Sequence, residues 1–179
     1  MAAQAVPAAT DPLEDDGLEL LIGQFGSDGA LAVDPNNPLV VYLVRRSFGG
    51  GKVFESGNGG GGWLNLTRNL PDVPAHAIVL DPRTSPATLY VGTDAGVYQS
   101  VNGGSSWTRF GTGLPNTMVT DLQLSTQRDF LDAATYGRGA WQIPINTTST
   151  IREYTVLLTA VRPSSGNNDS GISRSIFLL

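Results

Sequence analysis

The sequence predicts an all-β fold assembled from repeated four-stranded antiparallel sheets. Two observations predict it: short apolar runs bounded by turn residues, and the same phrases returning at a nearly constant spacing. The runs are about five residues long and rich in Val, Leu, Ile, Tyr and Trp, with Gly, Pro, Asn or Asp between them. No segment carries a sustained helical period, and a short helix is expected at most around residues 18–22.

The spacing of the repeats indicates the architecture. The three openings, Leu31, Ile78 and Leu122, lie 47 and 44 residues apart. A period of roughly 40–50 residues, with four strands in each unit, is typical of β-propeller blades. We therefore expect about three blades in a partial or open propeller, although the third repeat has no evident fourth strand. A generic antiparallel sandwich has similar strands and turns, but nothing in a sandwich requires a fixed interval.

Both complete repeats carry the pattern Ser-x-Asn-x-Gly-x-x-Trp in the hairpin between their third and fourth strands. The Asn side chain is expected to bond nearby backbone N–H groups, the glycines to adopt positive φ, and the Trp to cover the hairpin. We assign these residues a structural role. They are Ser56, Asn58, Gly60 and Trp63 in the first copy and Ser100, Asn102, Gly104 and Trp107 in the second.

The pattern resembles the Asp-box, or bacterial neuraminidase repeat, of sialidases, xyloglucanase-like glycoside hydrolases and sortilin-type receptors. Asn stands here where that family most often has Asp, which keeps the turn chemistry and removes the charge. The phrases at 89–98 and 134–141 also look like that family, and the resemblance covers roughly residues 27–145. It implies a propeller fold in which the boxes themselves are structural.

Composition excludes several classes of site. The net charge of −5, with scattered Lys and Arg, argues against a nucleic-acid surface. The absence of Cys excludes disulfides and thiolate metal sites, and His76 is the only histidine, which excludes a multi-histidine metal site. We expect no metal and no cofactor. No apolar run is long enough to span a bilayer.

We divide the chain into an N-terminal arm or lead-in strand, a propeller segment and a tail with possible extra strands. The first positive charge is Arg45, so residues 1–26 lack a secretory n-region, and the signal of an exported protein would lie outside this sequence. Known propellers have at least four blades, so we expect the missing blades from a longer chain or from self-association. The segments are 1–26, 27–145 and 146–179, with blades near 31–67, 78–110 and 122–143 and tail runs at 154–161 and 175–179.

Topology places the candidate ligand face on the rim opposite the boxes, where the loops joining second to third strands and the connections between blades meet. A glycoside hydrolase needs two carboxyl groups about 5–10 Å apart, and Asp94 and Asp121 are the weak candidates for such a pair. A sialidase would need an arginine cluster, which Tyr136 and Arg138 do not supply. The further ligand-face candidates are Asp72, His76, Asn116, Tyr136 and Arg138.

These features favour a non-catalytic propeller module that binds carbohydrate or protein, or serves as a scaffold, in a larger exported bacterial protein. We expect an extracellular or cell-envelope location. Two motif copies and the lack of a convincing catalytic set support this interpretation. Two alternatives stay open: part of a xyloglucanase-like glycoside hydrolase using a carboxyl pair, and an assembly factor similar to photosystem-assembly propellers, for which the sequence has no discriminating residue.

Overall fold

The computed structural model describes residues 29–145 and 152–154, which consist of strands, turns and loops. Twelve strands form three four-stranded antiparallel sheets, each in the order of the sequence, as predicted. The short helix expected around 18–22, the arm at 1–26 and most of the tail lie outside the described residues. Within the described ranges there is no helix that could cross a membrane.

Each sheet is an up-and-down meander. The first contains β1 (Gly29–Asp34), β2 (Asn37–Arg45), β3 (Val53–Ser56) and β4 (Leu64–Asn65). The second contains β5 (Ala75–Asp81), β6 (Thr88–Thr93), β7 (Gly96–Ser100) and β8 (Thr108–Phe110). The third contains β9 (Val119–Ser125), β10 (Phe130–Thr135), β11 (Ala140–Pro144) and β12 (Arg152–Tyr154). The short strand β12 pairs with β11 and supplies the fourth strand that was not evident in the third repeat.

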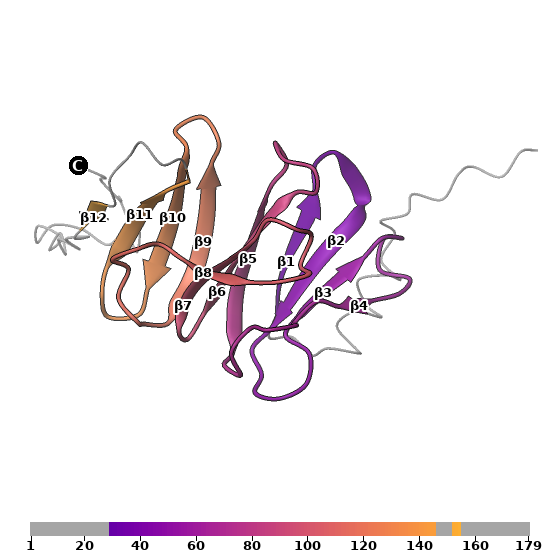
Figure 1. Cartoon of the computed structure of the whole chain (residues 1–179), viewed down its shortest axis with the longest axis horizontal. Helices are drawn as coiled ribbons and strands as arrows, with labels where there is room; N and C mark the ends of the chain where they lie inside the picture. Colours follow the sequence, from indigo (N-terminus) through magenta and orange to yellow (C-terminus); the bar gives the residue numbers. More distant parts are fainter. Residues whose placement is uncertain (1–28, 146–151, 155–179) are drawn as a thin grey trace, which may run out of the picture.

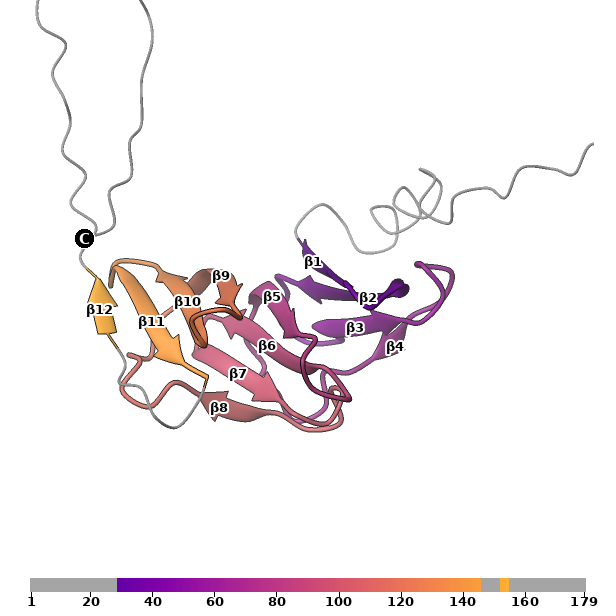
Figure 2. The ribbon, with the colours of Figure 1, turned by 90° about the horizontal axis from the view of Figure 1, so that it is seen from above.

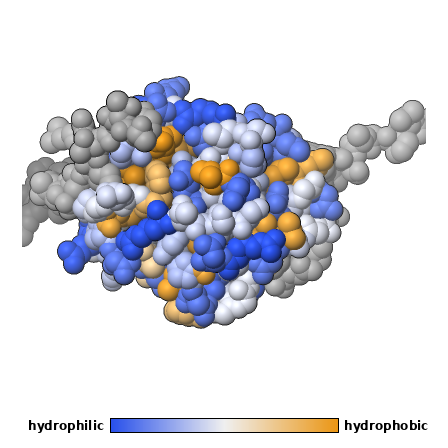
Figure 3. All heavy atoms as spheres, viewed as in Figure 1, coloured by the Kyte–Doolittle hydropathy of each residue, from blue (hydrophilic) through white to orange (hydrophobic). Residues whose placement is uncertain are grey.

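The three sheets follow one another along an arc, as Figures 1 and 2 show. The first strand of each sheet is the inner one, so that β1 lies beside β5, and β5 lies beside β9. Glycine permits one close approach in this row: a Cβ on Gly92 of β6 would lie only 2.8 Å from Val119 of β9. On the face seen in Figure 3, apolar residues form small separate patches among hydrophilic ones.

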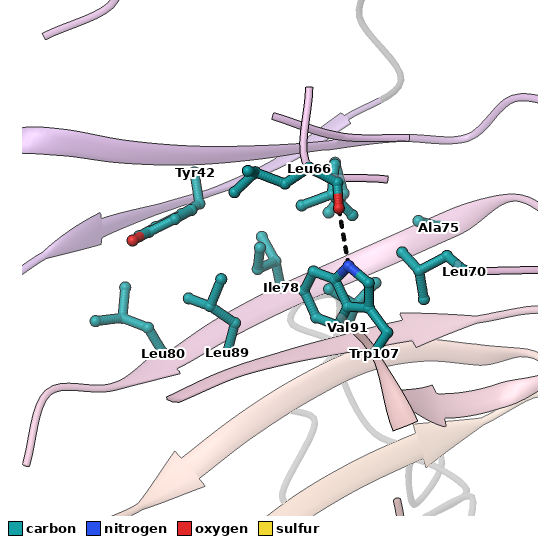
Figure 4. Close-up of a cluster of buried hydrophobic side chains, with 11 residues drawn as sticks. Tyr42, Leu66, Leu70, Ala75, Ile78, Leu80, Leu89, Val91 and Trp107 are labelled. Atoms are coloured by element: carbon teal, nitrogen blue, oxygen red, sulfur yellow. Dashed lines mark hydrogen bonds between the residues drawn. The ribbon is translucent and has the colours of Figure 1, made fainter. Parts of the chain in front are cut away.

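Two apolar cores hold the sheets together, one on each face of the second sheet. Side chains alternate along a strand, so Ile78 of β5 enters the first core while Ala77 enters the second. The first core, between the first and second sheets, is drawn in Figure 4. Full burial of a Val, Leu or Ile side chain contributes about 1.5–3 kcal/mol, so both interfaces are substantial. The main members of the second core are Tyr90, Val97, Leu114, Val119, Leu122, Leu131 and Ile143.

Candidate functional site

The two motif loops lie on one rim of the array, together with the turns that join first to second strands. Gly59 N–H in the first loop donates to Leu39 O at 2.8 Å. In the second loop Gly103 lies against Pro86 of the β5–β6 turn. We call this side the motif rim. The other side, called the loop rim, consists of residues 46–52, 66–74, 94–95, 111–118 and 136–139.

A buried serine hydroxyl is the centre of each motif loop. Ser100 Oγ accepts a hydrogen bond from Gly104 N–H at 2.8 Å and donates to Asn102 Oδ1 at 2.9 Å. Asn102 Oδ1 also accepts from Ser106 N–H at 3.0 Å, as the sequence predicted for this side chain. Ser56 makes the same two bonds in the first copy. The serine and asparagine side chains form their hydrogen bonds within their own hairpins. Their role is therefore to stabilise the fold of the loop.

The sequence predicted that each motif tryptophan covers its own hairpin. Trp63 packs against Leu43 and Phe54 of its own sheet, whereas Trp107 links its sheet to the preceding one. Trp107 Nε1–H donates to Leu66 O at 2.8 Å, beyond the last strand of the first sheet (Figure 4). The side chain of Asn69 bonds both Trp107 N–H and Trp107 O, each at 2.8 Å. The indole of Trp107 packs against apolar residues of the preceding sheet and is part of the first core.

On the loop rim, Asp72 fastens the long loop between β2 and β3. Its Oδ1 accepts from the buried Lys52 ammonium group at 2.5 Å and from Gly49 N–H at 2.7 Å. The hydrogen bond from Lys52 lowers the pKa of the Asp72 carboxyl below its usual range. The carboxylate is exposed to solvent, yet its two partners belong to the loop that it holds.

The structure brings together two of the predicted residues, His76 and Asp94. His76 lies at an irregularity of β5, between Ala75 and Ala77, where the register with β6 shifts. Its Nε2 is 2.6 Å from Asp94 Oδ1. Asp94 N–H in turn donates to Pro74 O at 3.1 Å, which fixes the β6–β7 turn. The pair is a hydrogen-bonded imidazole and carboxylate, with the histidine largely buried.

Asp121 lies in a different setting from Asp94. It follows the alternation of β9, in which Leu122 packs toward the second sheet. Asp121 therefore lies on the outer face of the third sheet, opposite Ala134 in the register. Its Oδ1 accepts from Leu122 N–H at 2.9 Å. The two candidate carboxyl groups thus belong to different sheets, and Asp94 is already bonded to His76.

Tyr136 and Arg138 project from a turn that backbone contacts hold in place. Tyr136 N–H donates to Met118 O at 2.9 Å, and Thr117 Oγ1 donates to Tyr136 O at 3.1 Å. Trp141 Nε1–H donates to Arg138 O at 2.9 Å. The Tyr136 side chain is 74% exposed, and Arg138 is exposed as well. Between them Gly137 has a φ of +73°, a value that favours glycine.

Asn116 lies on the adjacent loop, beside a shallow hollow. Its Oδ1 accepts from Arg109 Nη1 at 3.4 Å. The hollow is lined by residues 109–114 and has a volume of about 210 Å³. Small-molecule sites typically enclose about 300–1,000 Å³. Within the part of the chain that the structure describes, no group of three or more His, Asp or Glu residues is placed to hold a metal ion.

Sequence reasoning missed Arg83, which ties the second sheet to the third on the motif rim. Its guanidinium donates to Asp81 Oδ2 at 2.7 Å, to Asp129 Oδ1 at 2.6 Å and to Thr126 O at 3.0 Å. The bonds from Arg83 lower the pKa of the buried Asp81 carboxyl. The Asp-Pro-Arg phrase indicated a turn at this position. It could not indicate the partners of Arg83, because Thr126 and Asp129 are 43 and 46 residues away in the sequence.

No family model matches the sequence, and no curated protein matches it. Solved structures do match. The GH74 xyloglucanase from Xanthomonas campestris aligns with a TM-score of 0.56 at 21% identity, covering 76% of this chain and 23% of that one. A GH74 enzyme from Niastella koreensis aligns with a TM-score of 0.54 at 21% identity, covering 69% and 22%. The extracellular domain of a putative one-component system from B. thetaiotaomicron aligns with a TM-score of 0.51 at 18% identity, covering 69% and 16%.

The aligned part of this chain covers less than a quarter of the length of each of these proteins. Identities of this size carry information about the fold alone. Together with the three four-stranded antiparallel sheets in sequence order, the alignments confirm the predicted fold class. The chain is an all-β protein with the blade arrangement of a partial β-propeller.

Proposed function

We propose that this chain is a β-propeller module of the Asp-box type that works by binding, with a carbohydrate or protein ligand on the loop rim. One observation carries the proposal: Asp72 and Asp94 are each hydrogen-bonded to another side chain of the fold, whereas Tyr136 and Arg138 are exposed on a turn held by backbone contacts. A catalytic acid and base must both face the reacting bond. Asp94 is bonded to His76, and Asp121 lies on the outer face of the third sheet, so each carboxyl group has a setting of its own.

The chemistry of the projecting turn suits recognition. Tyr offers a large amphipathic face with few rotatable bonds, and Arg presents a planar set of five donors. Tyr and Arg are both enriched among the residues that dominate protein interfaces. The backbone bonds around Tyr136 and Arg138 fix the turn in advance, which reduces the ordering cost of binding.

We extend the proposal to a larger exported protein at the cell surface or outside the cell. The fold similarity to the extracellular domain and to the GH74 enzymes supports this extension. The motif copies support the Asp-box assignment, because Ser, Asn and Gly act together as a hairpin lock in both.

The test is binding of the full chain to a glycan array that includes xyloglucan oligosaccharides, and to candidate envelope proteins in purified form. We expect Tyr136→Ala and Arg138→Ala each to weaken binding about 10-fold, which corresponds to about 1.4 kcal/mol. Arg128→Ala is the matched control, since Arg128 is exposed on the motif rim. Binding that is unaffected by both loop-rim variants, or absent from every ligand, contradicts the proposal.

The glycoside hydrolase alternative is favoured by one observation, the fold similarity to GH74 enzymes. Its test uses the same chain with a panel of β-glucans. Hydrolysis that is lost on Asp94→Asn or Asp121→Asn would replace the binding proposal with the catalytic one.

A further inference from the structure

Two connections of the loop rim each present an exposed aromatic side chain near an exposed arginine. In the β2–β3 loop these are Phe48, which is 71% exposed, and Arg46. In the β10–β11 turn they are Tyr136, which is 74% exposed, and Arg138. In both cases the two residues are two positions apart in the sequence. Both connections join the second to the third strand, so the first and third sheets present the same pair of side-chain types on one rim.

The β2–β3 loop is fixed at its base, as the β10–β11 turn is. Arg45 N–H donates to Lys52 O at 2.9 Å and closes the loop. Directly after Phe48, Gly49 N–H donates to Asp72 Oδ1 at 2.7 Å. A Cβ on Gly49 would have open space around it, so the tip of the loop is uncovered within the part of the chain that the structure describes. The loop therefore presents its apolar ring to solvent in a preformed position.

A third arginine belongs to the second sheet, between these two connections. The guanidinium of Arg109 lies beside the end of the β6–β7 turn, where a Cβ on Gly96 would be 3.3 Å from Arg109 Nη2. Its hydrogen bonds to Asn116 Oδ1 and Leu114 O are both long, at 3.4 Å. A guanidinium has five N–H donors, so these two bonds leave donors for a ligand. Each of the three sheets thus places one exposed arginine on the loop rim.

The charge of the loop rim is opposite to that of the whole sequence, which is −5. The charged residues of the loop rim are the cations Arg46, Lys52, Arg68 and Arg138 and the anions Asp72 and Asp94. Among the residues that the structure describes, Arg46, Arg109 and Arg138 form no ion pair with an acidic side chain. Arg83 on the motif rim, in contrast, is paired with two carboxylates. The loop rim therefore offers positive charge that the fold itself does not use.

We propose that the loop rim binds a linear acidic polysaccharide, a chain of uronate sugars whose carboxylates pair with Arg46, Arg109 and Arg138. This inference rests on the proposed function and names its ligand class. A uronate carries its carboxylate directly on the sugar ring, so each sugar offers an apolar ring face and an anion together. The flat faces of Phe48 and Tyr136 suit the ring, and the guanidinium fork suits the carboxylate.

Neither an acidic peptide nor a neutral glycan matches both features of the surface. Asp and Glu side chains supply carboxylates but no rigid ring face for Phe48 and Tyr136. A neutral glycan supplies ring faces but leaves the three arginines without a counter-charge, which electrostatic complementarity disfavours. The combination of exposed aromatic rings with unpaired arginines on three successive sheets therefore favours a charged sugar chain.

The test is calorimetric titration of the full chain with a long oligogalacturonate and with the same oligomer fully methyl-esterified. The ester keeps the sugar rings and removes their charge. We expect the ester to bind at least about 10-fold more weakly, and binding of the acid to weaken as salt is added. Poly-glutamate of equal charge, which has no sugar rings, should also bind about 10-fold more weakly than the oligogalacturonate.

Single substitutions locate the contacts. Phe48→Ala, Arg46→Gln and Arg109→Gln should each weaken oligogalacturonate binding about 5- to 10-fold. Arg128→Gln removes the same charge from the exposed surface of the motif rim and should change the affinity less than about 2-fold. Thermal unfolding followed by circular dichroism verifies that each variant is folded, as expected for exposed positions.

Equal affinity for the acid and its ester, or for oligogalacturonate and poly-glutamate, overturns the inference. So does an Arg128→Gln effect as large as that of Arg46→Gln, or binding that depends on Arg138 alone among the loop-rim arginines. If oligogalacturonate does not bind but another glycan or protein binds in a Tyr136-dependent manner, this inference fails and the proposed function stands. If no ligand binds at all, both fail.

Discussion

At the scale of single residues, the motif loops depend on a hydroxyl group rather than on the amide that the sequence emphasised. Ser56 and Ser100 are buried, and each satisfies a backbone N–H that would otherwise be buried without a partner. An unsatisfied buried donor is more costly than the loss of one hydrogen bond, because its desolvation is not offset. The serine hydroxyl of each motif is therefore expected to be sensitive to substitution by Ala.

We predict that Ser100→Ala lowers the free energy of unfolding by about 1–3 kcal/mol, since Gly104 N–H loses its acceptor. Urea denaturation checks this value. Ser105→Ala is the control, because Ser105 is exposed in the same loop, and a change within about 0.5 kcal/mol is expected there. Equal effects of the two substitutions would contradict the role given to Ser100.

Asp81 provides a prediction about pH. The hydrogen bonds from Arg83 lower the folded-state pKa of this carboxyl, so its stabilising contribution is present above the unfolded-state pKa of about 3.9 and is lost as pH falls through the folded value. Asp81→Asn should therefore cost about 1–2 kcal/mol at pH 7, and the difference from wild type should shrink below about pH 4. Denaturation of both proteins between pH 3 and pH 7 measures it, and a constant or widening gap toward acid pH is the opposite result.

At the scale of elements, the connections between sheets are made by segments distant in the sequence. The indole of Trp107 and the side chain of Asn69 join the second motif loop to the segment after β4. Arg83 does the same for the second and third sheets. These hydrogen bonds restrict how neighbouring sheets are oriented, because apolar packing by itself is non-directional.

We predict that Asn69→Ala destabilises the chain by about 2 kcal/mol, because both hydrogen bonds to the backbone of Trp107 are lost. Asn116→Ala serves as the control, since Asn116 is exposed and its contact with Arg109 is long, at 3.4 Å. Thermal unfolding of the two variants beside wild type makes the comparison. A smaller effect for Asn69→Ala than for Asn116→Ala would refute the tie between the sheets.

The elements themselves were largely predictable, and the reasons are local. Alternating apolar residues, Asp-Pro turns and the repeat spacing indicated eleven of the strands, because each signal lies within a few residues of the strand that it specifies. The tail run at 154–161 was one candidate for the missing outer strand, but the bounds of β12 were not recognised, since three residues carry no period of their own. The contacts of Lys52, Asn69 and Arg83 could not be predicted either, because they depend on which segments the fold brings together.

The candidate site was predictable in position but not in detail. The blade topology expected from the repeats is enough to put His76, Asp94, Tyr136 and Arg138 on the loop-rim side. It could not indicate that His76 would bond Asp94, because the pairing depends on the irregularity in β5. The face on which Asp121 lies follows from alternation with Leu122, which a strand assignment with correct register would have given.

At the scale of the whole molecule, the second sheet is the centre of the array. It contributes to both apolar cores, so the first and third sheets are coupled through it even though each packs on a different face. The loop rim, which takes loops from all three sheets, exists as one surface only if the three sheets pack as one unit. In repeat proteins such coupling between neighbours determines whether unfolding is cooperative.

The most direct test compares unfolding at the two interfaces in single-tryptophan variants. Trp63→Phe combined with Trp141→Phe leaves Trp107 in the first core, and Trp63→Phe combined with Trp107→Phe leaves Trp141 beside the second. Circular dichroism of each variant provides an independent probe of the strands in the same sample. In each variant we predict that the urea midpoint from tryptophan fluorescence coincides with that from circular dichroism, because the sheets unfold together. Fluorescence and dichroism midpoints that separate within one variant would show independently folding sheets and contradict the account.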